Sequence, residues 1–279
     1  MNQKLIFLDI DGTILIPGEG IRQSVRDGLR RARARRHRIF ICTGRACRML
    51  PEELQDMELD GVIASAGSDI WIHGQNVYRR FLPETLVRKA IRIIRELSGI
   101  CVLEGCDQIY LSEEGMQILR EERSEADENP ELFRWREFFR KRTNVQSIDL
   151  WEPDRSPIPK VTFILNHRED ANQLCEYLEK EFYVALFPQE SGSICNGELI
   201  SRTDNKGTAV RHTADFLHVD IWNTVAFGDS MNDYQMLEQA GCAVAMGNAD
   251  EELEKIADRI CEPVEDDGVI RELERMKII

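Results

Sequence analysis

The stretch from Lys4 to Leu15, KLIFLDIDGTIL, joins a short apolar run to two aspartates and a glycine. The run from Leu5 to Leu8 is too short for a helix and predicts a strand that is buried on both faces of a parallel sheet. Asp9 then follows the carboxyl end of that strand and Asp11 comes two residues later, at the edge where open α/β sheets bind their ligands. Asp-x-Asp-Gly is also common in simple turns, so the rest of the chain decides between a turn and a site.

Composition narrows the class of protein. A chain of 279 residues with 42% apolar residues can build one large core or two smaller ones. The formal charge of -14 argues against a nucleic-acid partner and against attraction to an anionic membrane. No apolar run approaches the roughly 18 residues of a membrane span, and the first residues lack the layout of a secretory signal. We therefore expect a cytoplasmic protein, monomeric or homodimeric, with neither nucleic acid nor membrane as partner.

The eight cysteines are scattered along the chain without Cys-x-x-Cys spacing. No histidine is spaced to complete a zinc site with them. This pattern favours reduced, mostly buried thiols over a disulfide framework or a zinc centre.

Two further apolar runs end in polar residues. Ile39 to Cys42 is followed by Thr43-Gly44-Arg45, and Thr224 to Phe227 is followed by the sequence GDSMND. A hydroxyl, a glycine amide and a guanidinium together can hold a phosphate, although Thr-Gly-Arg alone is more often a helix start. Because the carboxyl ends of parallel strands meet at one edge of a sheet, we expect these polar groups near Asp9.

Two cationic features have competing interpretations. Lys206 is predicted near the amino end of a helix, where a cation is unfavourable to the dipole, so a functional role and a surface position both stay open. The predicted helix from Ile21 to Arg36 carries seven arginines, most of them toward its carboxyl end. Cations there complement the dipole, which favours a solvated basic face over an anion-binding patch.

The domain organisation follows from a change of pattern near residue 82. Before residue 82 and after residue 190, short apolar strands alternate with helices, which predicts a doubly wound parallel sheet. Residues 82–190 have the mixed strand and helix pattern of an α+β unit. We therefore expect a core formed by 1–81 and 191–279 with an inserted domain at 82–190. Ser193 to Ser201 is predicted to be the strand that returns to the core.

Four segments, in this order, resemble the motifs of the haloacid dehalogenase superfamily: DIDGTIL at 9–15, CTGR at 42–45, NKG at 205–207 and GDSMND at 228–233. The insertion resembles the type II cap, subclass B, of the Cof-type sugar-phosphate phosphatases. The resemblance implies a Rossmann-like α/β core with an α+β cap that is mobile and selects the substrate. One position departs from the pattern, since many relatives have Asn-Gly after the third strand and this chain has Ala66-Gly67.

The resemblance also implies roles for individual residues. Asp9 would be the nucleophile that accepts the phosphoryl group, Asp11 the general acid/base, and Lys206 a catalytic cation. Mg²⁺ would be held by the Asp9 carboxylate, the backbone carbonyl of Asp11 and the side chain of Asp229, with Asp233 contributing either directly or through a water. The groups expected to bind phosphate oxygens are Thr43, Gly44, Lys206 and Asn232.

Elementary electrostatics agrees with this assignment. At about 3.5 Å, a carboxylate charge facing a phosphate charge costs roughly 5 kcal/mol at an effective dielectric constant near 20. A divalent metal and one lysine offset that repulsion, and carboxylate ligands without His or Cys favour Mg²⁺ over zinc.

The leading hypothesis is a Mg²⁺-dependent phosphatase that acts on small phosphorylated metabolites, and the resemblance favours sugar phosphates. The alternatives are a phosphomutase or phosphotransferase of the same superfamily, or a non-catalytic protein that binds a phosphorylated metabolite. A non-catalytic descendant would be expected to have lost at least one of the acidic or lysine motif residues, and all of them are present.

Overall fold

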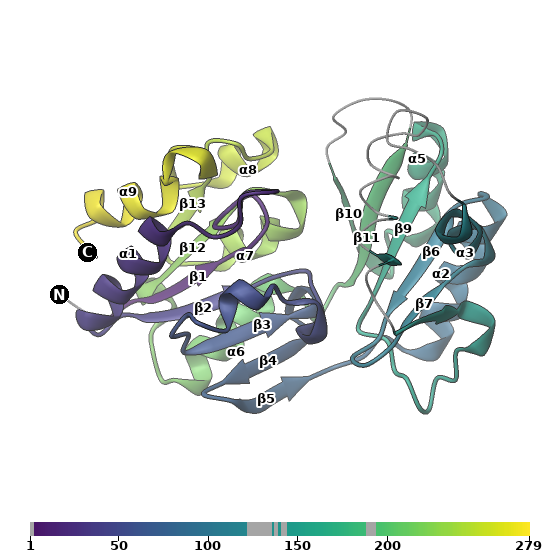
Figure 1. The fold of residues 1–279 in the computed structure, drawn as a ribbon, viewed down its shortest axis with the longest axis horizontal. Coiled ribbons are helices and arrows are strands. Elements are labelled where there is room, and N and C mark those ends of the chain that lie inside the picture. The colour runs from purple at the N-terminus through teal and green to yellow at the C-terminus, as the bar shows by residue number, and fades with distance from the viewer. Residues whose placement is uncertain (1–2, 122–135, 137–138, 141–143, 188–193) are drawn as a thin grey trace. The chain divides into compact units, whose positions relative to one another are not determined.

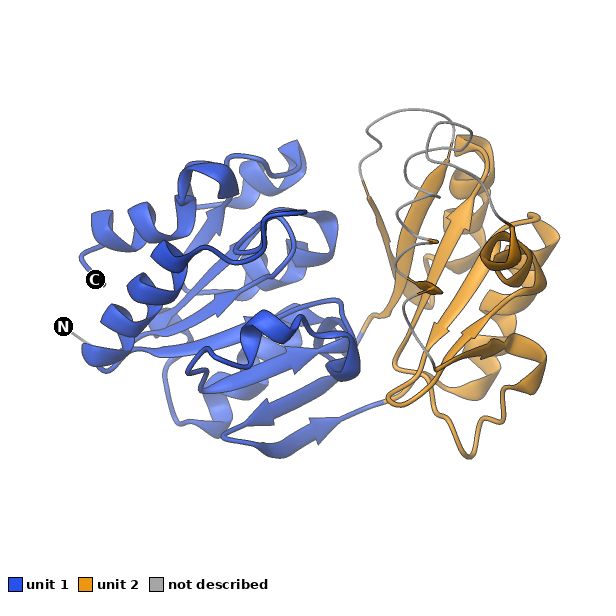
Figure 2. Cartoon of the chain, viewed as in Figure 1, with its two compact units in different colours: residues 1–80, 203–279 blue, residues 81–202 orange. Residues whose placement is uncertain are grey.

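The computed structural model describes residues 3–121, 136, 139–140, 144–187 and 194–279. The chain forms two compact units, one made of Met1–Arg80 with Thr203–Ile279 and the other of Phe81–Arg202 (Figure 2). Each unit has its own sheet and its own buried apolar core. Within the described residues, no helix has both the length and the apolar character that a membrane crossing requires.

The described residues of the first unit form an eight-stranded sheet with the order β14-β13-β12-β1-β2-β3-β4-β5 (Figure 1). The strands from β14 to β3 run parallel to one another, and β4 and β5 continue the sheet as an antiparallel hairpin. The strands span Leu5–Leu8 (β1), Arg38–Cys42 (β2), Gly61–Ala64 (β3), Asp69–Ile72 (β4), Gln75–Arg79 (β5), Thr224–Gly228 (β12), Ala243–Ala245 (β13) and Arg259–Ile260 (β14). β1 lies between β2 and β12, and all four of its residues are buried, as its continuous apolar run predicted.

Helices cover both faces of this sheet, which makes it doubly wound as predicted. The helices are Gln23–Ala34 (α1), Lys206–Phe216 (α6), Tyr234–Gln239 (α7), Glu251–Ile256 (α8) and Gly268–Arg275 (α9). Helices α1 and α9 share one core with Ile6 and Leu8 of β1, while α6, α7 and α8 share the other core with Leu5 and Phe7. Successive side chains of a strand point to opposite faces, so all four residues of β1 are buried. Short 3₁₀ helices lie at Cys47–Met49, Glu52–Leu54, Ser65–Gly67 (η3), Ile221–Asn223, Met231–Asp233 (η7) and Val264–Asp266.

The second unit has the expected α+β character. Its described strands form a sheet with the order β10-β11-β9-β6-β7-β8, antiparallel except between β7 and β8. The strands are Ile100–Glu104 (β6), Ile109–Leu111 (β7), Val145–Ser147 (β8), Lys160–Leu165 (β9), Phe182–Leu186 (β10) and Cys195–Ser201 (β11). The helices are Glu84–Glu96 (α2), Glu113–Arg120 (α3) and Arg168–Leu178 (α5), with a 3₁₀ turn at Ile148–Leu150. Helices α2 and α5 pack on one face of the sheet, where Val87 and Leu174 are fully buried.

The prediction that Ser193 to Ser201 returns to the first domain was wrong. β11 pairs antiparallel with β9 and with β10, so Leu199 lies opposite both Val161 and Val184. The second unit accordingly extends to Arg202, and the expected boundary between 190 and 191 falls outside the described residues. An apolar alternation predicts a strand but does not say which sheet supplies its partners.

Candidate active site

The parallel strands of the first unit bring three predicted site residues to one edge. β1 pairs in register with β2 on one side and β12 on the other. Asp9, Thr43 and Asp229 directly follow these three strands. Asp9 is 5% exposed, and its backbone N donates to the carbonyl oxygen of Phe227 at 3.1 Å. Two stretches more than 200 residues apart in the chain therefore meet at Asp9.

Lys206 is the first residue of α6 and is fully buried. Its Nζ donates to Asp9 Oδ1 at 2.7 Å, to Asp233 Oδ1 at 2.6 Å and to Asn232 Oδ1 at 2.9 Å. Asn205 caps the helix, since its side chain accepts from the backbone N of Thr208 at 3.0 Å, and this cap determines where α6 begins. The position of Lys206 excludes the alternative of a solvated surface lysine.

Three carboxylates gather beside this ammonium group. Asp9, Asp229 and Asp233 can each offer one oxygen such that all three atoms lie within 4.8 Å of one another. Asp233 Oδ2 accepts from the backbone N of Asp229 at 3.0 Å and of Ser230 at 3.2 Å, which orients the carboxylate. The side chain of Asp11 is not part of the cluster found among the described residues, and its expected contribution was the backbone carbonyl.

The charges of this cluster are not balanced by the protein alone. Burial raises the pKa of Asp9 to about 8, the Lys206 ammonium opposes that rise, and the neighbouring Asp233 and Asp11 add to it. Burial and the carboxylates of Asp233 and Asp9 raise the pKa of Asp229 well above its usual range. For Lys206, burial would lower the pKa, but the two carboxylates that it contacts outweigh burial and raise it.

One ammonium among three carboxylates leaves excess negative charge in a buried site, and a divalent cation would neutralise it. The donors are all carboxylate oxygens, which suit a hard cation such as Mg²⁺. The residues present therefore fit the metal that the sequence predicted.

Two residues of the first motif have contacts that the sequence did not predict. Thr13 is buried, and its Oγ1 donates to Asp229 Oδ1 at 2.8 Å. Gly12 has φ of +79°, and a Cβ on it would lie 2.4 Å from Asp229 Oδ2. The turn after β1 must therefore be glycine here, both for its backbone and for the space that Asp229 occupies.

The predicted phosphate-binding residues lie around the same strand ends. Thr43 and Gly44 are buried, and Thr43 Oγ1 accepts from the backbone N of Arg45 at 3.1 Å. Asn232, in η7, accepts at its Oδ1 from Ser230 Oγ at 3.2 Å as well as from Lys206. Asn232 therefore lies in the same segment as Asp229 and Asp233, and Thr43 follows the strand that pairs with the one before Asp9.

Arg45 pairs with Asp11, which the sequence did not predict. Arg45 Nε donates to Asp11 Oδ2 at 2.7 Å and Arg45 Nη2 donates to Asp11 Oδ1 at 2.6 Å. Both carboxylate oxygens of Asp11 are engaged by this fork, a geometry that only arginine offers.

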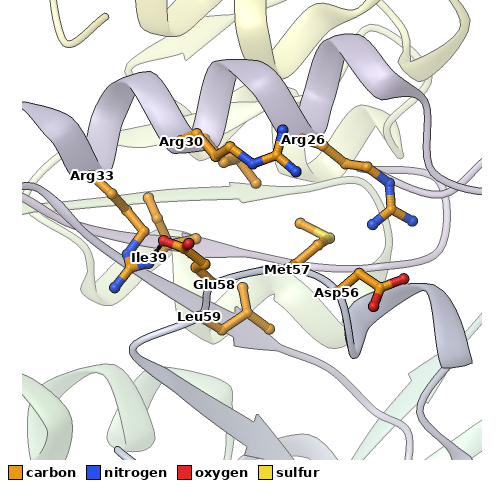
Figure 3. A pocket seen from close by; sticks show the side chains of 9 residues that line it. Arg26, Arg30, Arg33, Ile39, Asp56, Met57, Glu58 and Leu59 are labelled. Carbon is orange, nitrogen blue, oxygen red and sulfur yellow. Dashed lines mark hydrogen bonds and ion pairs between the residues drawn. The ribbon is translucent and has the colours of Figure 1, made fainter.

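The basic helix α1, for which a solvated face and an anion-binding patch were both considered, borders a small hollow elsewhere in the first unit. Arg26, Arg30 and Arg33 of α1 lie along it, opposite the segment from Asp56 to Leu59 (Figure 3). Its volume is about 10 Å³, room for about one water, and none of the motif residues lines it. Arg30 pairs with Asp27 at 2.7 Å, and Arg33 pairs with Glu58 and Asp60. These contacts agree with a solvated, ion-paired face and give no support to a substrate pocket there.

Comparison with known proteins gives consistent matches along the whole chain. The model of the haloacid dehalogenase-like hydrolase family matches residues 6–273. The 5-amino-6-(5-phospho-D-ribitylamino)uracil phosphatase YitU of Bacillus subtilis is 29% identical over 275 residues, which cover 96% of this chain and 95% of that protein.

Two solved structures are similar across nearly their full length. The HAD subclass IIB sugar phosphatase BT4131 has a TM-score of 0.80 at 21% identity, covering 99% of this chain and 100% of that one. A haloacid dehalogenase-like hydrolase from B. subtilis has a TM-score of 0.81 at 24% identity, covering 98% and 99%. At these identities the structures show a shared fold.

Proposed function

Because this chain belongs to the haloacid dehalogenase-like hydrolase family and its relatives include phosphatases, we propose that it is a Mg²⁺-dependent phosphatase of small phosphorylated metabolites. The observation that carries the proposal is the buried contact of Lys206 Nζ with Asp9 Oδ1, beside two further carboxylates. A carboxylate held by a lysine in this way has one oxygen engaged and the other, Oδ2, available for attack on phosphorus.

The proposed reaction has two steps that use the protein's own groups. Asp9 Oδ2 forms a bond to phosphorus, the bond from phosphorus to the substrate oxygen breaks, and Asp11 gives a proton to the leaving alkoxide. A water then attacks the phosphorus of the aspartyl-phosphate, Asp11 takes the proton of that water, and Asp9 leaves as a carboxylate with release of inorganic phosphate. Asp11 thus ends each turnover with the proton that it gave away in the first step.

The remaining residues bind and orient the phosphoryl group. Thr43, Gly44, Lys206 and Asn232 are proposed to contact its oxygens, and Asp9, Asp11, Asp229 and Asp233 to hold Mg²⁺. When bound, the metal supplies positive charge that offsets the repulsion between carboxylate and phosphate. Transfer then depends mainly on positioning, which the capped start of α6 and the oriented Asp233 provide.

For the substrate class, we propose phosphorylated sugars or sugar alcohols. The support comes from two similar proteins, since BT4131 is a sugar phosphatase and YitU is a phosphatase of a phosphoribityl compound. The second candidate, a phosphomutase or phosphotransferase, has the same active-site residues and differs in where the phosphoryl group goes.

The test is a screen of phosphorylated metabolites with released inorganic phosphate as the measured quantity. We expect release that stops with EDTA, returns with Mg²⁺ and is absent in Asp9→Asn. Full activity in thoroughly chelated protein would contradict the metal assignment. Transfer to a second sugar, with no phosphate released until a bisphosphate is added, would favour the mutase.

A further inference from the structure

The acid/base residue of the proposed reaction is held by a single side chain. Asp11 lies in the turn after β1, its side chain is 48% exposed, and the next residue is the left-handed Gly12. Among the described residues, both hydrogen bonds to the Asp11 carboxylate come from Arg45, at 2.7 and 2.6 Å. An exposed aspartate in a turn would otherwise sample several rotamers.

Arg45 is itself fixed on several sides. Its Nη1 donates to the carbonyl oxygen of Met49 at 3.2 Å, and its carbonyl oxygen accepts from the backbone N of Ser65 at 2.8 Å. Its backbone N donates to the hydroxyl of Thr43 at 3.1 Å. Hydrogen bonds therefore hold both the side chain and the backbone of Arg45. One of the backbone contacts is with Thr43, which is proposed to contact the phosphoryl group.

We propose that Arg45 is a positioning residue that holds Asp11 in the orientation required for proton transfer. The inference rests on the function proposed above. In the reacting complex one Asp11 oxygen turns to the substrate oxygen or the attacking water, while the other keeps its hydrogen bond to Arg45. A two-point contact suits this task, because losing one bond leaves the carboxylate still tethered.

The alternative role for Arg45 is direct binding of the phosphoryl group, which the run Thr43-Gly44-Arg45 suggested from composition. The structure instead directs Nε and Nη2 of the fork at Asp11 and Nη1 at a backbone carbonyl. The two roles affect different steps of the reaction. If Arg45 binds phosphate, its loss should slow formation of the phosphoenzyme. If Arg45 positions Asp11, its loss should slow the steps in which Asp11 transfers a proton.

The experiment is a double-mutant cycle in the full-length protein with Mg²⁺ and nitrophenyl phosphate. The variants are Arg45→Met, Asp11→Asn and the pair together, with Arg48→Met as the control, an exposed arginine in the same segment. Rapid mixing separates the burst of nitrophenolate, which reports phosphoenzyme formation, from the slow phase, which reports its hydrolysis. Nitrophenolate leaves readily without an acid, so the burst does not need Asp11.

We expect Arg45→Met to slow the second phase by about 10- to 100-fold, the scale of partial loss of acid/base catalysis, and to leave the burst rate within about threefold of the parent. In the Asp11→Asn background the same substitution should change the second phase by less than about threefold, because its effect acts through Asp11. Arg45→Lys, which can restore one hydrogen bond, should recover part of the loss. Arg48→Met should match the parent.

Two results would overturn the proposal. One is a slower burst or a raised KM for Arg45→Met that is equal in both backgrounds, as expected of a phosphate ligand. The other is parent-like kinetics in Arg45→Met and Arg45→Lys proteins whose melting temperatures match the parent. If Asp11→Asn itself shows no burst and no loss, the proposed function fails at its second step, which is a separate outcome.

Discussion

At the scale of single residues, the site has more negative charge than the protein compensates. Lys206 contacts two of the three clustered carboxylates and forms no bond with Asp229. Asp229 is instead held by the hydroxyl of Thr13, which is neutral. Without a cation the folded state keeps these groups together against their repulsion, so their protonation and metal binding should both appear in stability measurements.

This imbalance predicts how the stability of metal-free protein depends on pH. The ordinary pKa of Asp9 is 3.8, and in the folded protein it is about 8. Between these values the folded state binds more protons than the unfolded chain, so stability should fall as pH rises from about 4 to 8. We expect the melting temperature in EDTA to drop by about 5 °C or more between pH 5 and 8, since about 1 kcal/mol corresponds to about 2–4 °C in a protein of this size.

Added Mg²⁺ should raise the melting temperature more at pH 8 than at pH 5, because it binds the ionised carboxylates. Asp229→Asn is the control, since it removes one charge and should raise the melting temperature in EDTA at pH 8 while reducing the effect of Mg²⁺. A Mg²⁺ effect that is equal at both pH values, or larger at pH 5, would argue against a metal on this cluster.

At the scale of elements, the turn after β1 determines the position of Asp229. Gly12 is in the left-handed region and lies against the Asp229 carboxylate, with no room for a Cβ. The 3₁₀ turn η3 has a similar conformation, and Ala66 there has φ of 53° and is fully buried. Asparagine adopts that region more readily than alanine, which gives a backbone reason for the asparagine that the family resemblance leads us to expect at this position.

Gly12→Ala and Gly18→Ala form a matched pair. Both glycines have φ near +80°, so each substitution costs about 1–2 kcal/mol of backbone strain. A Cβ at Gly18 meets no atom within 4 Å, whereas a Cβ at Gly12 would displace Asp229. We expect Gly12→Ala to lower Mg²⁺ affinity by about 10-fold or more, the usual cost of disturbing a ligand's surroundings, and Gly18→Ala to leave it unchanged.

The measurement is the Mg²⁺ dependence of both activity and melting temperature. Equal losses in the two variants would mean that backbone strain alone matters and that the contact with Asp229 has no role.

Sequence patterns predicted some elements better than others, for physical reasons. The buried strands β1, β2 and β12 were predictable because a strand covered on both faces has a continuous apolar run, and their polar ends therefore converge. The sheet that β11 joins was not predictable, because an apolar residue such as Leu199 suits a strand of either sheet. Only its pairing partners, which are distant in the sequence, determine which sheet β11 joins. The pairing of Arg45 with Asp11 depends on the directions of two side chains from adjacent strand ends, which spacing along the chain does not encode.

At the scale of the whole molecule, all the proposed catalytic and metal-binding residues belong to the first unit. We propose that the second unit selects the substrate. Its sheet has one apolar face packed under α2 and α5, and alternation directs Thr162 and Asn196 to the other face. Thr162 Oγ1 donates to Glu104 Oε1 at 2.6 Å, and Asn196 Oδ1 is buried without a hydrogen-bond partner among the described residues.

Thr162→Val and Asn196→Ala should therefore change the preference among phosphorylated sugars and sugar alcohols. We expect ratios of kcat/KM to shift by about 10-fold, the scale of one lost polar contact, with nitrophenyl phosphate hydrolysis within about threefold of the parent. Tyr177→Phe, on the exposed side of α5, is the control and should change neither. If hydrolysis of the sugar and aryl esters falls together in folded protein, the second unit does not act as a selector.

In the proposed reaction Asp9 carries the phosphoryl group and Asp11 is needed to remove it, so trapping the phosphorylated intermediate tests both roles in one experiment. Asp11→Asn protein is mixed with nitrophenyl phosphate and Mg²⁺, quenched in acid, and analysed by mass spectrometry of its peptides. We predict close to one phosphoryl group per chain, on Asp9 and labile to hydroxylamine, and none in Asp9→Asn protein. A phosphoryl group on another residue, or Asp11→Asn protein that turns over at the parent rate without accumulating any, would contradict the account.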